Sequence, residues 1–316
     1  MGRLAFSPHV GAALAASGLS VAVTGGGGWI GQGALEMLEG ALGDDFAARV
    51  RVFGSRARSL ELRSGRQVAC APLARMAELP PGPWAFLHFA FLTRDRLGGQ
   101  SVDSFIAGNQ AITDTVAAAA ERVHVRGMVS VSSGAVHLPG GLEGNAYGAM
   151  KLREEERLSE LAGRLGAALM VPRLFALSGP FVNKLDTYAL ASILVAALKG
   201  GPVVLRAGHR VERSYIHVRD VVDLCVAGML AGDCPQAPFD ACGSEVVEMG
   251  ELARRALAVL GRPAIAIERP PVDATRVDRY TGDPATVRAL AARHGIRLLD
   301  LDAQIASTAE YLHQLS

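Results

Sequence analysis

Short apolar runs alternate with alanine-rich stretches along the first half of the chain. The apolar runs that predict strands are residues 19–23, 50–53, 67–71, 85–90 and 127–131, and the stretch 106–120 predicts a helix. This alternation is typical of βαβ units, which build a parallel sheet whose ligands bind at the carboxyl ends of the strands. After Pro172 the pattern is less regular, because Gly200-Gly201-Pro202 and the prolines of 262–271 interrupt it.

From this pattern we expect an α/β protein of the Rossmann type, with a doubly wound parallel sheet. Residues 1–18 are interpreted as an N-terminal extension with a short helix, 19–172 as the NAD(P)-binding domain, and 173–316 mainly as a smaller substrate-binding domain. A chain of 316 residues is longer than one hydrophobic core usually allows, which agrees with two closely integrated domains.

Composition narrows the classes of partner. Half of the residues are apolar and a fifth are charged, as in a globular protein without a long apolar span. The net charge of +1 provides no general attraction to nucleic acid or to a membrane surface, so small molecules are the expected partners.

The four cysteines are Cys70, Cys225, Cys234 and Cys242. Their spacing is not that of metal ligands, so we expect no metal site, free thiols and a reducing, cytoplasmic compartment.

A glycine-rich turn follows the first predicted strand. Residues 24–31 read TGGGGWIG. Gly25 can adopt a positive φ, Gly28 allows a pyrophosphate to approach the backbone, and Gly31 allows helix and strand to pack closely. Trp29 and Ile30 begin the predicted helix, whose N-terminal N–H groups and dipole favour an anion. The alternative is a glycine turn with a purely structural role.

A tyrosine and a lysine form the candidate catalytic pair. Tyr147 and Lys151 are four residues apart on a predicted helix, so both side chains lie on one face. An ammonium near a phenol lowers the pKa of the tyrosine from its ordinary value near ~10, so the pair can exchange a proton near neutral pH. Ser133 follows a predicted strand and can bind a carbonyl oxygen, and Ser132 is the second candidate. The alternative is an exposed tyrosine beside a solvated lysine.

The glycine turn, the strand-end serine and the YxxxK sequence, in this order, resemble the short-chain dehydrogenase/reductases. Later segments resemble the extended branch of that family, which contains nucleotide-sugar epimerases, dehydratases and ketoreductases. Arg173-Leu174-Phe175 with Ser178-Gly179-Pro180 is similar to the RxFNxYGP segment of the branch, and residues 213–220 are similar to its RDFxHVxD segment. The resemblance covers nearly the whole chain and implies that about 214–245 return to the main sheet.

The resemblance also implies roles for single residues. Tyr147 would donate or accept the proton, Lys151 would activate the tyrosine and bind the ribose, and Ser133 would orient the substrate. Asn109 would hold a water in a proton relay to Lys151, or else cap or kink its helix. The cofactor would also contact Phe89, Ala90 and Pro172. A homodimer through the helices corresponding to 106–120 and 147–162 is expected on the same ground.

The end of the second predicted strand bears on the choice of cofactor. Enzymes that select NAD usually have an acid there, whereas an arginine accommodates the additional phosphate of NADP. Residues 52–56 read VFGSR and contain no acid. Ser55, Arg56 and also Arg58 could bind a 2′-phosphate, so we expect NADP(H) to be favoured over NAD(H). The alternative is a solvated loop rich in arginine, with Arg56, Arg58, Arg63 and Arg66.

Arginines of the second half are candidates for the substrate. By resemblance Arg213 contacts a nucleotide diphosphate, and Arg276 or Arg279 is a second contact. His88, His137 and His217 lie in segments similar to the family but lack ligand spacing, so we interpret them as structural. Ala176 departs from RxFN, and Phe91 replaces the small residue that usually follows HxA.

Together these features predict an NADP(H)-dependent ketoreductase that acts on a nucleotide-linked deoxysugar. One alternative is an NAD-dependent nucleotide-sugar epimerase or dehydratase. Another is a protein that senses NADP(H) without catalysis, although such a protein would not need Ser133, Tyr147 and Lys151.

Overall fold

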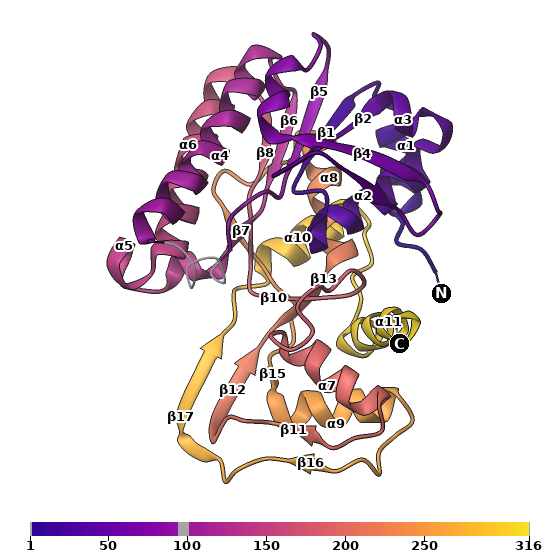
Figure 1. Cartoon of the computed structure of the whole chain (residues 1–316), viewed down its shortest axis with the longest axis vertical. Helices are drawn as coiled ribbons and strands as arrows, with labels where there is room; N and C mark the ends of the chain where they lie inside the picture. Colours follow the sequence, from indigo (N-terminus) through magenta and orange to yellow (C-terminus); the bar gives the residue numbers. More distant parts are fainter. Residues whose placement is uncertain (1, 94–100, 316) are drawn as a thin grey trace. The chain divides into compact units, whose positions relative to one another are not determined.

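The computed structural model describes residues 2–93 and 101–315 (Figure 1). The chain forms two compact units. The first, which we call the sheet unit, consists of Arg3–Arg173 and Val222–Phe239. The second, the C-terminal unit, contains Leu174–Val221 and the chain from Asp240 onward. None of the helices in the described ranges has the combination of length and apolarity that crossing a bilayer requires.

The sheet unit contains a seven-stranded sheet in the order β3-β4-β2-β1-β5-β6-β8. Its strands are β1 Ser20–Thr24, β2 Val50–Gly54, β3 Arg58–Glu61, β4 Gln67–Pro72, β5 Trp84–His88, β6 Gly127–Ser130 and β8 Ala168–Met170. Neighbouring strands are parallel, except that β3 pairs antiparallel with β4 at the edge. With β1 in the middle and crossovers on both sides, this is the predicted doubly wound fold, which is confirmed.

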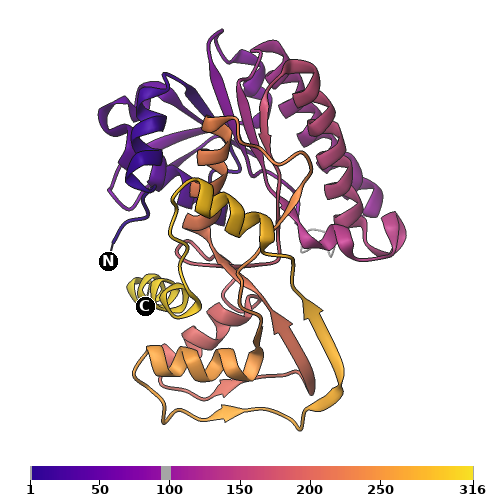
Figure 2. The same ribbon diagram turned by 180° about the vertical axis from the view of Figure 1, so that it is seen from behind.

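Helices of the sheet unit lie on both faces of the sheet, as the crossovers require. They are α1 Pro8–Ala16, α2 Trp29–Leu42, α3 Phe46–Arg49, α4 Val102–Arg122, α5 Gly141–Gly144 and α6 Ala146–Leu165, with short 3-10 turns at Gly43–Asp45, Leu73–Glu78 and Gly134–His137. The long helices α4 and α6 lie side by side in both views (Figure 1 and Figure 2). Their apolar faces bury Val116, Leu158 and Leu161 against Phe86 and Met128 of the sheet.

Local capping explains where α4 and α6 begin. The Ser101 hydroxyl accepts the Ser104 N–H at the start of α4, and the Asn145 amide oxygen accepts the Gly148 N–H at the start of α6, each at 3.1 Å. Side chains of this type satisfy N–H groups that lack helical partners. At its other end, α6 stops at Gly166, whose φ of 62° is favourable for glycine. The helix that presents Tyr147 and Lys151 is therefore delimited by its own sequence.

The N-terminal segment is more than an extension ahead of the domain. Its helix α1 packs on α2, and four apolar side chains of the segment are buried: Leu4, Phe6, Val10 and Leu14. The Arg49 guanidinium donates to the carbonyl oxygens of Leu14, Ala15 and Leu19 at 2.8 to 2.9 Å. Because this arginine ties α1 and the start of β1 to α3, the segment is part of the sheet unit.

The C-terminal unit consists of short strands and four helices. The strands are β10 Ala176–Ser178, β11 Val203–Val204, β12 His209–Arg213, β13 Tyr215–His217, β15 Val247–Glu248, β16 Ile267–Glu268 and β17 Asp273–Tyr280. The helices are α7 Ala189–Leu198, α9 Met249–Val259, α10 Ala285–Arg293 and α11 Leu301–Gln314. Strand β12 lies between β15 and β17, while β10 pairs with β13 and β11 with β16. Five of these seven strands have only two or three residues, which explains the irregular sequence pattern after Pro172.

Three further elements carry residues of both units, namely β9 Pro172–Leu174, α8 Val218–Ala231 and β14 Phe239–Ala241. The two-residue strand β7 Ser132–Ser133 follows β6 in the sheet unit.

Candidate active site

The glycine turn joins β1 to α2 and has the geometry that its sequence predicts. Gly25 has a φ of 69°, and its N–H donates to the Phe53 carbonyl oxygen at 2.9 Å. A Cβ atom at Gly31 would lie 2.3 Å from the Gly25 carbonyl oxygen, so a larger residue would separate helix and turn. Gly28 is the N-cap of α2 and has no side chain to cap it, so the helix that begins with Trp29 and Ile30 presents its N-terminal end to an anion.

An arginine lies against this turn. A Cβ atom at Gly27 would lie 1.7 Å from Nη2 of Arg58, so the guanidinium is packed on the glycine itself. Arg58 begins the edge strand β3 and pairs in register with Cys70 of β4. The alternative of a solvated loop does not hold for Arg63 and Arg66, whose guanidiniums bind Glu36 and Glu39 of α2. Arg56 and Arg58 are exposed.

Ser55 and Arg56 follow β2 and are both exposed. The last residue of β2 is Gly54, and a Cβ atom there would lie 2.9 Å from the Cys70 sulfur. The end of β2 therefore carries no carboxylate, and the nearby cation that touches the turn is Arg58 rather than Arg56.

A chain of buried hydrogen bonds runs from β1 to α6. The N–H groups of Phe89 and Ala90 both donate to the Thr24 hydroxyl oxygen at 3.2 Å. The Thr24 hydroxyl lies 2.6 Å from Nδ1 of His88, and Nε2 of His88 lies 2.9 Å from Glu154. Because the threonine oxygen already accepts two bonds, its proton is directed to Nδ1, and the histidine proton on Nε2 is directed to the carboxylate.

The other oxygen of Glu154 holds the candidate catalytic lysine. Nζ of Lys151 donates to this oxygen and to the Val131 carbonyl oxygen, each at 2.7 Å. Burial alone would raise the pKa of Glu154, but the charge of Lys151 and the hydrogen bond from His88 outweigh it, so the pKa is lowered. The buried acid is thus an anion paired with a buried cation.

Phe91 covers the same ammonium. Nζ of Lys151 lies 3.7 Å from the centroid of the Phe91 ring, which also meets the Tyr147 ring edge to face at 5.6 Å. Tyr147, Lys151 and Glu154 share one face of α6, and Phe91 packs over the first two. The structure therefore brings the predicted tyrosine and lysine together around one aromatic ring.

The two serines of β7 have different partners. Ser132 is hydrogen-bonded to Glu155, which also receives Nε and Nη2 of Arg173 at 2.9 and 2.6 Å. Ser133 is buried at the start of a 3-10 turn, where its oxygen accepts the Ala135 N–H at 3.2 Å. Ser132 therefore belongs to the Glu155–Arg173 pair, and the role of Ser133 toward the substrate stays a prediction.

Asn109 is buried in α4 and its amide contacts backbone groups. Its oxygen accepts the Leu92 N–H at 2.8 Å, and its nitrogen donates to the carbonyl oxygens of Leu92 and Phe105. This arrangement attaches the chain after β5 to α4, a structural role that differs from the expected capping or kinking of the helix. A water relay to Lys151 stays a prediction. Pro172, predicted to line the cofactor, is the first residue of β9 and is buried.

Two of the three arginines predicted to contact the substrate, Arg213 and Arg279, are paired with acids of the C-terminal unit. Nη2 of Arg213 lies 2.9 Å from Asp278, and Nη1 donates to the carbonyl oxygens of Glu212 and Asp278. Arg279 pairs with Glu212 at 2.7 Å, while Arg276 is exposed on β17. Of these arginines, Arg213 has the least exposed guanidinium and an acid that is itself half exposed.

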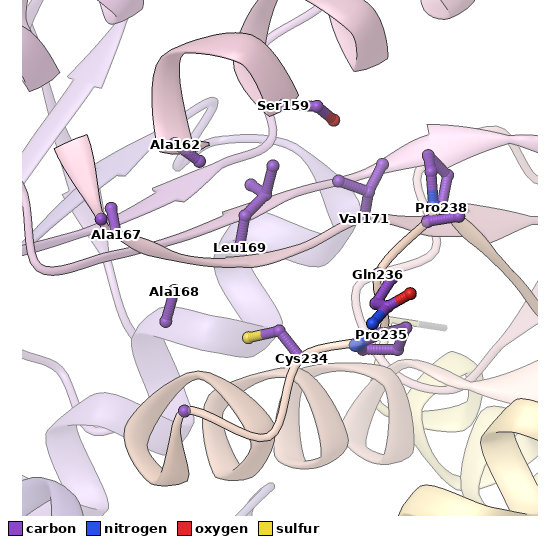
Figure 3. Close-up of a pocket in the computed structure, with 13 residues that line it drawn as sticks. Ser159, Ala162, Ala167, Ala168, Leu169, Val171, Cys234, Pro235, Gln236 and Pro238 are labelled. Carbon is purple, nitrogen blue, oxygen red and sulfur yellow. The ribbon is translucent and has the colours of Figure 1, made fainter. Parts of the chain in front are cut away.

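A pocket of about 420 Å³ lies elsewhere in the sheet unit, along β8 at the edge of the sheet. Leu169 and Val171 lie on one side of it, and Cys234, Pro235 and Gln236 lie on the other (Figure 3). Its lining includes none of the predicted catalytic residues. Within 2–93 and 101–315, histidines, cysteines and acids do not gather in groups of three that could hold a metal ion.

Sequence reasoning missed Glu154 and the position of Phe91. Glu154 is the first of three consecutive acids, a pattern typical of a solvated surface. Its spacing of three residues from Lys151 was the available signal, because such residues are neighbours on a helix. Phe91 was visible as a departure from the family sequence, but its contact with Lys151 depends on the path of the chain after β5.

A glycine turn after the first strand of a doubly wound sheet, with Ser133, Tyr147 and Lys151 in the same unit, defines a dinucleotide-dependent α/β enzyme. Comparison with known proteins makes this more specific. Residues 21–237 match the NAD dependent epimerase/dehydratase family, and the chain belongs to that family. The resemblance to extended short-chain dehydrogenase/reductases and the prediction of an NAD(P)-dependent enzyme of this type are confirmed. Membership supports the epimerase/dehydratase alternative better than the ketoreductase interpretation.

Solved structures agree on the fold. Epimerase Mth375 from Methanothermobacter thermautotrophicus has a TM-score of 0.73 at 16% identity, over 97% of this chain and 96% of the other. UDP-glucose 4-epimerase from Brucella ovis in complex with NAD has a TM-score of 0.71 at 20% identity, over 93% of this chain and 98% of the other. The dTDP-glucose 4,6-dehydratase DesIV from Streptomyces venezuelae with NAD and TYD bound has a TM-score of 0.71 at 20% identity, over 94% of this chain and 97% of the other. No curated protein sequence matches the chain.

Proposed function

We propose that the protein is a nucleotide-sugar epimerase that oxidises a sugar hydroxyl and reduces the resulting carbonyl again. The observation that carries this proposal is the placement of Tyr147 and Lys151 around Phe91, in a chain of the epimerase/dehydratase family. The similar UDP-glucose 4-epimerase and DesIV support a nucleotide-linked sugar as the substrate class.

The residues at the glycine turn suit a dinucleotide. Gly25 and Gly31 leave no room for side chains, and the uncapped start of α2 at Gly28 can receive a pyrophosphate. When bound, the nicotinamide would supply the acceptor and donor of hydride. This chain's own residues move the proton and orient the sugar.

Tyr147 is the acid and base of the proposed reaction. In the proposed oxidation, the sugar carbon would give up hydride while its hydroxyl loses a proton to the phenolate oxygen of Tyr147. In the reduction, hydride would return to the opposite face of the carbonyl carbon, and Tyr147 would return the proton to the carbonyl oxygen. Ser133 orients the oxygen by a hydrogen bond. Lys151 supplies positive charge beside the phenol. Glu154 reduces the effect of this charge, because its carboxylate is paired with the ammonium.

Epimerisation is favoured here over dehydration. Elimination of water from a sugar needs a further acid and base beside the oxidised carbon, in addition to the tyrosine. The residues that follow Ser133 are Gly134 and Ala135, which have no ionisable side chains. Ser133 and Tyr147 are sufficient for oxidation and reduction alone.

A ketoreductase that consumes NADPH is the second candidate, and the position of the Arg58 guanidinium is the observation that favours it. The guanidinium lies on Gly27, next to the carboxyl end of β2, where a dinucleotide places its adenosine ribose. An arginine there, without an acid at Gly54 or Ser55, suits a 2′-phosphate. For this second candidate we therefore propose NADP(H) as the preferred cofactor.

The test has two stages. A thermal-shift screen of nucleotide sugars, with NAD and with NADP, should identify the nucleotide, because a ligand at 100 times its dissociation constant adds about 2.7 kcal/mol of stability. Each stabilising sugar is then incubated with a trace of cofactor. Epimeric product formed in large excess over the cofactor supports the epimerase. One oxidised NADPH for each product molecule would instead establish the ketoreductase.

Tyr147→Phe is the matched variant, since it removes the proton and keeps the ring. It should retain cofactor binding and lose turnover. Wild-type turnover in this variant would refute the proton-transfer role.

We also propose a homodimer through α4 and α6, because the chain resembles a family whose members pair in this way. Light scattering after gel filtration tests it.

A further inference from the structure

Tyr147, Lys151 and Glu154 occupy positions i, i+4 and i+7 of α6, so they follow one another along a single helical face. Glu154 is the most deeply buried of the three, with only 2% of its surface exposed, and Lys151 is 5% exposed. Within the described ranges, the carboxylate contacts two ionisable groups, Lys151 from its own helix and His88 from β5. A buried acid placed in this way alters the charge that Tyr147 experiences.

The charge balance follows from the contacts. A lone ammonium near a phenol stabilises the phenolate, which makes the tyrosine a better base and a poorer acid at neutral pH. Here a carboxylate lies 2.7 Å from the ammonium, and the hydrogen-bond chain from Thr24 through His88 holds its other oxygen. The carboxylate therefore offsets part of the charge that the ammonium presents to Tyr147.

We propose that Glu154 is a positioning residue that neutralises the Lys151 ammonium and so keeps Tyr147 protonated and ready to donate its proton. The inference builds on the proposed function, in which Tyr147 is the acid and base. Its consequence is that, near neutral pH, the reduction half of the proposed epimerisation, which starts from the phenol, is favoured over the oxidation half, which starts from the phenolate. His88 and Thr24 support this role by fixing the carboxylate.

Further ionisable groups lie on the described elements that surround the first turns of α6. The elements that pack against the first turns of α6 carry Asp103 on α4, His137 in the 3-10 turn before α5 and Glu143 on α5. All three side chains are exposed, where solvent screens their charges. They are also unchanged in the variants proposed below.

The test is a titration of Tyr147 that needs no substrate. The full chain is labelled with tyrosine carrying ¹³C at the ring carbon that bears the hydroxyl, and its shift is followed by NMR from pH 6 upward in steps of about half a unit. The chain has five tyrosines, and Tyr147→Phe identifies the signal of interest by its loss. Because the readout is independent of turnover, failure of the proposed function and failure of this inference are separate results.

Glu154→Gln keeps the shape and hydrogen-bonding atoms of the side chain but removes its charge. We expect the titration midpoint of Tyr147 to fall by about one pH unit or more, since the ammonium then acts uncompensated. Glu156→Gln is the matched control, because Glu156 is exposed on the same helix, and it should leave the midpoint unchanged. A midpoint in Glu154→Gln equal to or above that of the wild type would overturn the proposal.

If Glu154→Gln does not fold, a second variant tests the role proposed for Glu154. Lys151→Met combined with Glu154→Gln removes both charges, a change that buried ion pairs often tolerate. If the pair is neutral as seen from Tyr147, the midpoint stays within a few tenths of a unit of the wild type. A clear rise in the double variant would mean that Lys151 acts as an uncompensated cation, and the role assigned to Glu154 would be wrong.

Discussion

The ring of Phe91 covers the ammonium of Lys151, with Nζ 3.7 Å from the ring centroid. The ammonium has three N–H bonds, of which two donate to Val131 and Glu154. The remaining direction faces the aromatic ring, where a cation is attracted to the π electrons. By resemblance, this lysine binds the cofactor ribose, so the ring and the ribose compete for the same group.

Phe91→Ala should therefore tighten binding of NAD(P). The ribose would no longer displace a cation–π contact worth about 0.5 to 2 kcal/mol, so the dissociation constant should fall roughly 2- to 30-fold. The same change should lower the free energy of unfolding by about 1 to 3 kcal/mol, because a half-buried ring leaves the Phe105 cluster. Calorimetry and urea unfolding measure the two effects. Phe91→Leu, which retains bulk without a π face, is the control, and weaker cofactor binding in Phe91→Ala would contradict the argument.

Arg58→Ala tests the preference for NADP. Its guanidinium lies on Gly27, so its loss should weaken NADP by about 1.5 to 3 kcal/mol, as expected for hydrogen bonds to a charged group, and should leave NAD nearly unchanged. Isothermal calorimetry with both cofactors measures this. Arg56→Ala, in the exposed bend after β2, is the matched comparison. A larger loss in Arg56→Ala would restore the sequence-based choice, and equal NAD and NADP affinity in the wild type would remove the basis for either.

Local rules predicted most of the sheet unit. The glycine turn and the strands β2 and β4 lie where apolar runs and turn residues place them, because each depends on neighbouring residues. The edge strand β3 was missed, since its four residues Arg58–Glu61 are mostly polar and exposed and show no apolar alternation. In the turn that follows β3, Arg63 and Arg66 pair with Glu36 and Glu39, which lie far away in the sequence.

Prediction of the candidate site reached the catalytic residues but not their partners. Tyr147 and Lys151 are recognisable because their spacing on one helix has chemical meaning. The Glu154–His88 contact joins residues 66 positions apart, and the contact between Lys151 and Phe91 depends on a loop. Such pairings arise only when strands and helices pack, so sequence periodicity carries no signal for them.

His217 makes stability depend on pH. Burial, and next the charge of Arg219, lower its pKa from the ordinary 6.5 to about 3. The neutral ring accepts the Arg219 N–H at Nδ1 and directs Nε2 to the Ser307 hydroxyl. The unfolded chain binds one more proton between pH 6.5 and 3, so this contribution to stability is complete above pH 6.5 and is lost as the pH falls toward 3.

His217→Asn should reduce this dependence on pH. At a slope of up to about 1.4 kcal/mol per pH unit, the wild type should lose about 2 kcal/mol more than the variant between pH 7 and pH 5. Urea unfolding at the two pH values measures the difference. His313→Asn, at an exposed position on α11, should behave as the wild type does. Parallel losses in wild type and His217→Asn would show that the histidine is not the group responsible.

Arg213 and Asp278 together test the substrate site. If Arg213 binds a nucleotide diphosphate, Arg213→Leu should raise KM far more than it lowers kcat, because ground state and transition state lose the same remote contact. Asp278 holds the guanidinium at 2.9 Å and is half exposed, so it competes with a phosphate for the same donors. Asp278→Asn should then lower KM by up to about fivefold, in line with about 1 kcal/mol for an exposed ion pair. Steady-state kinetics on the sugar identified by the thermal-shift screen distinguishes these outcomes. A raised KM in both variants would mean that the pair serves only to hold β12 to β17, and the phosphate contact would have to be sought elsewhere.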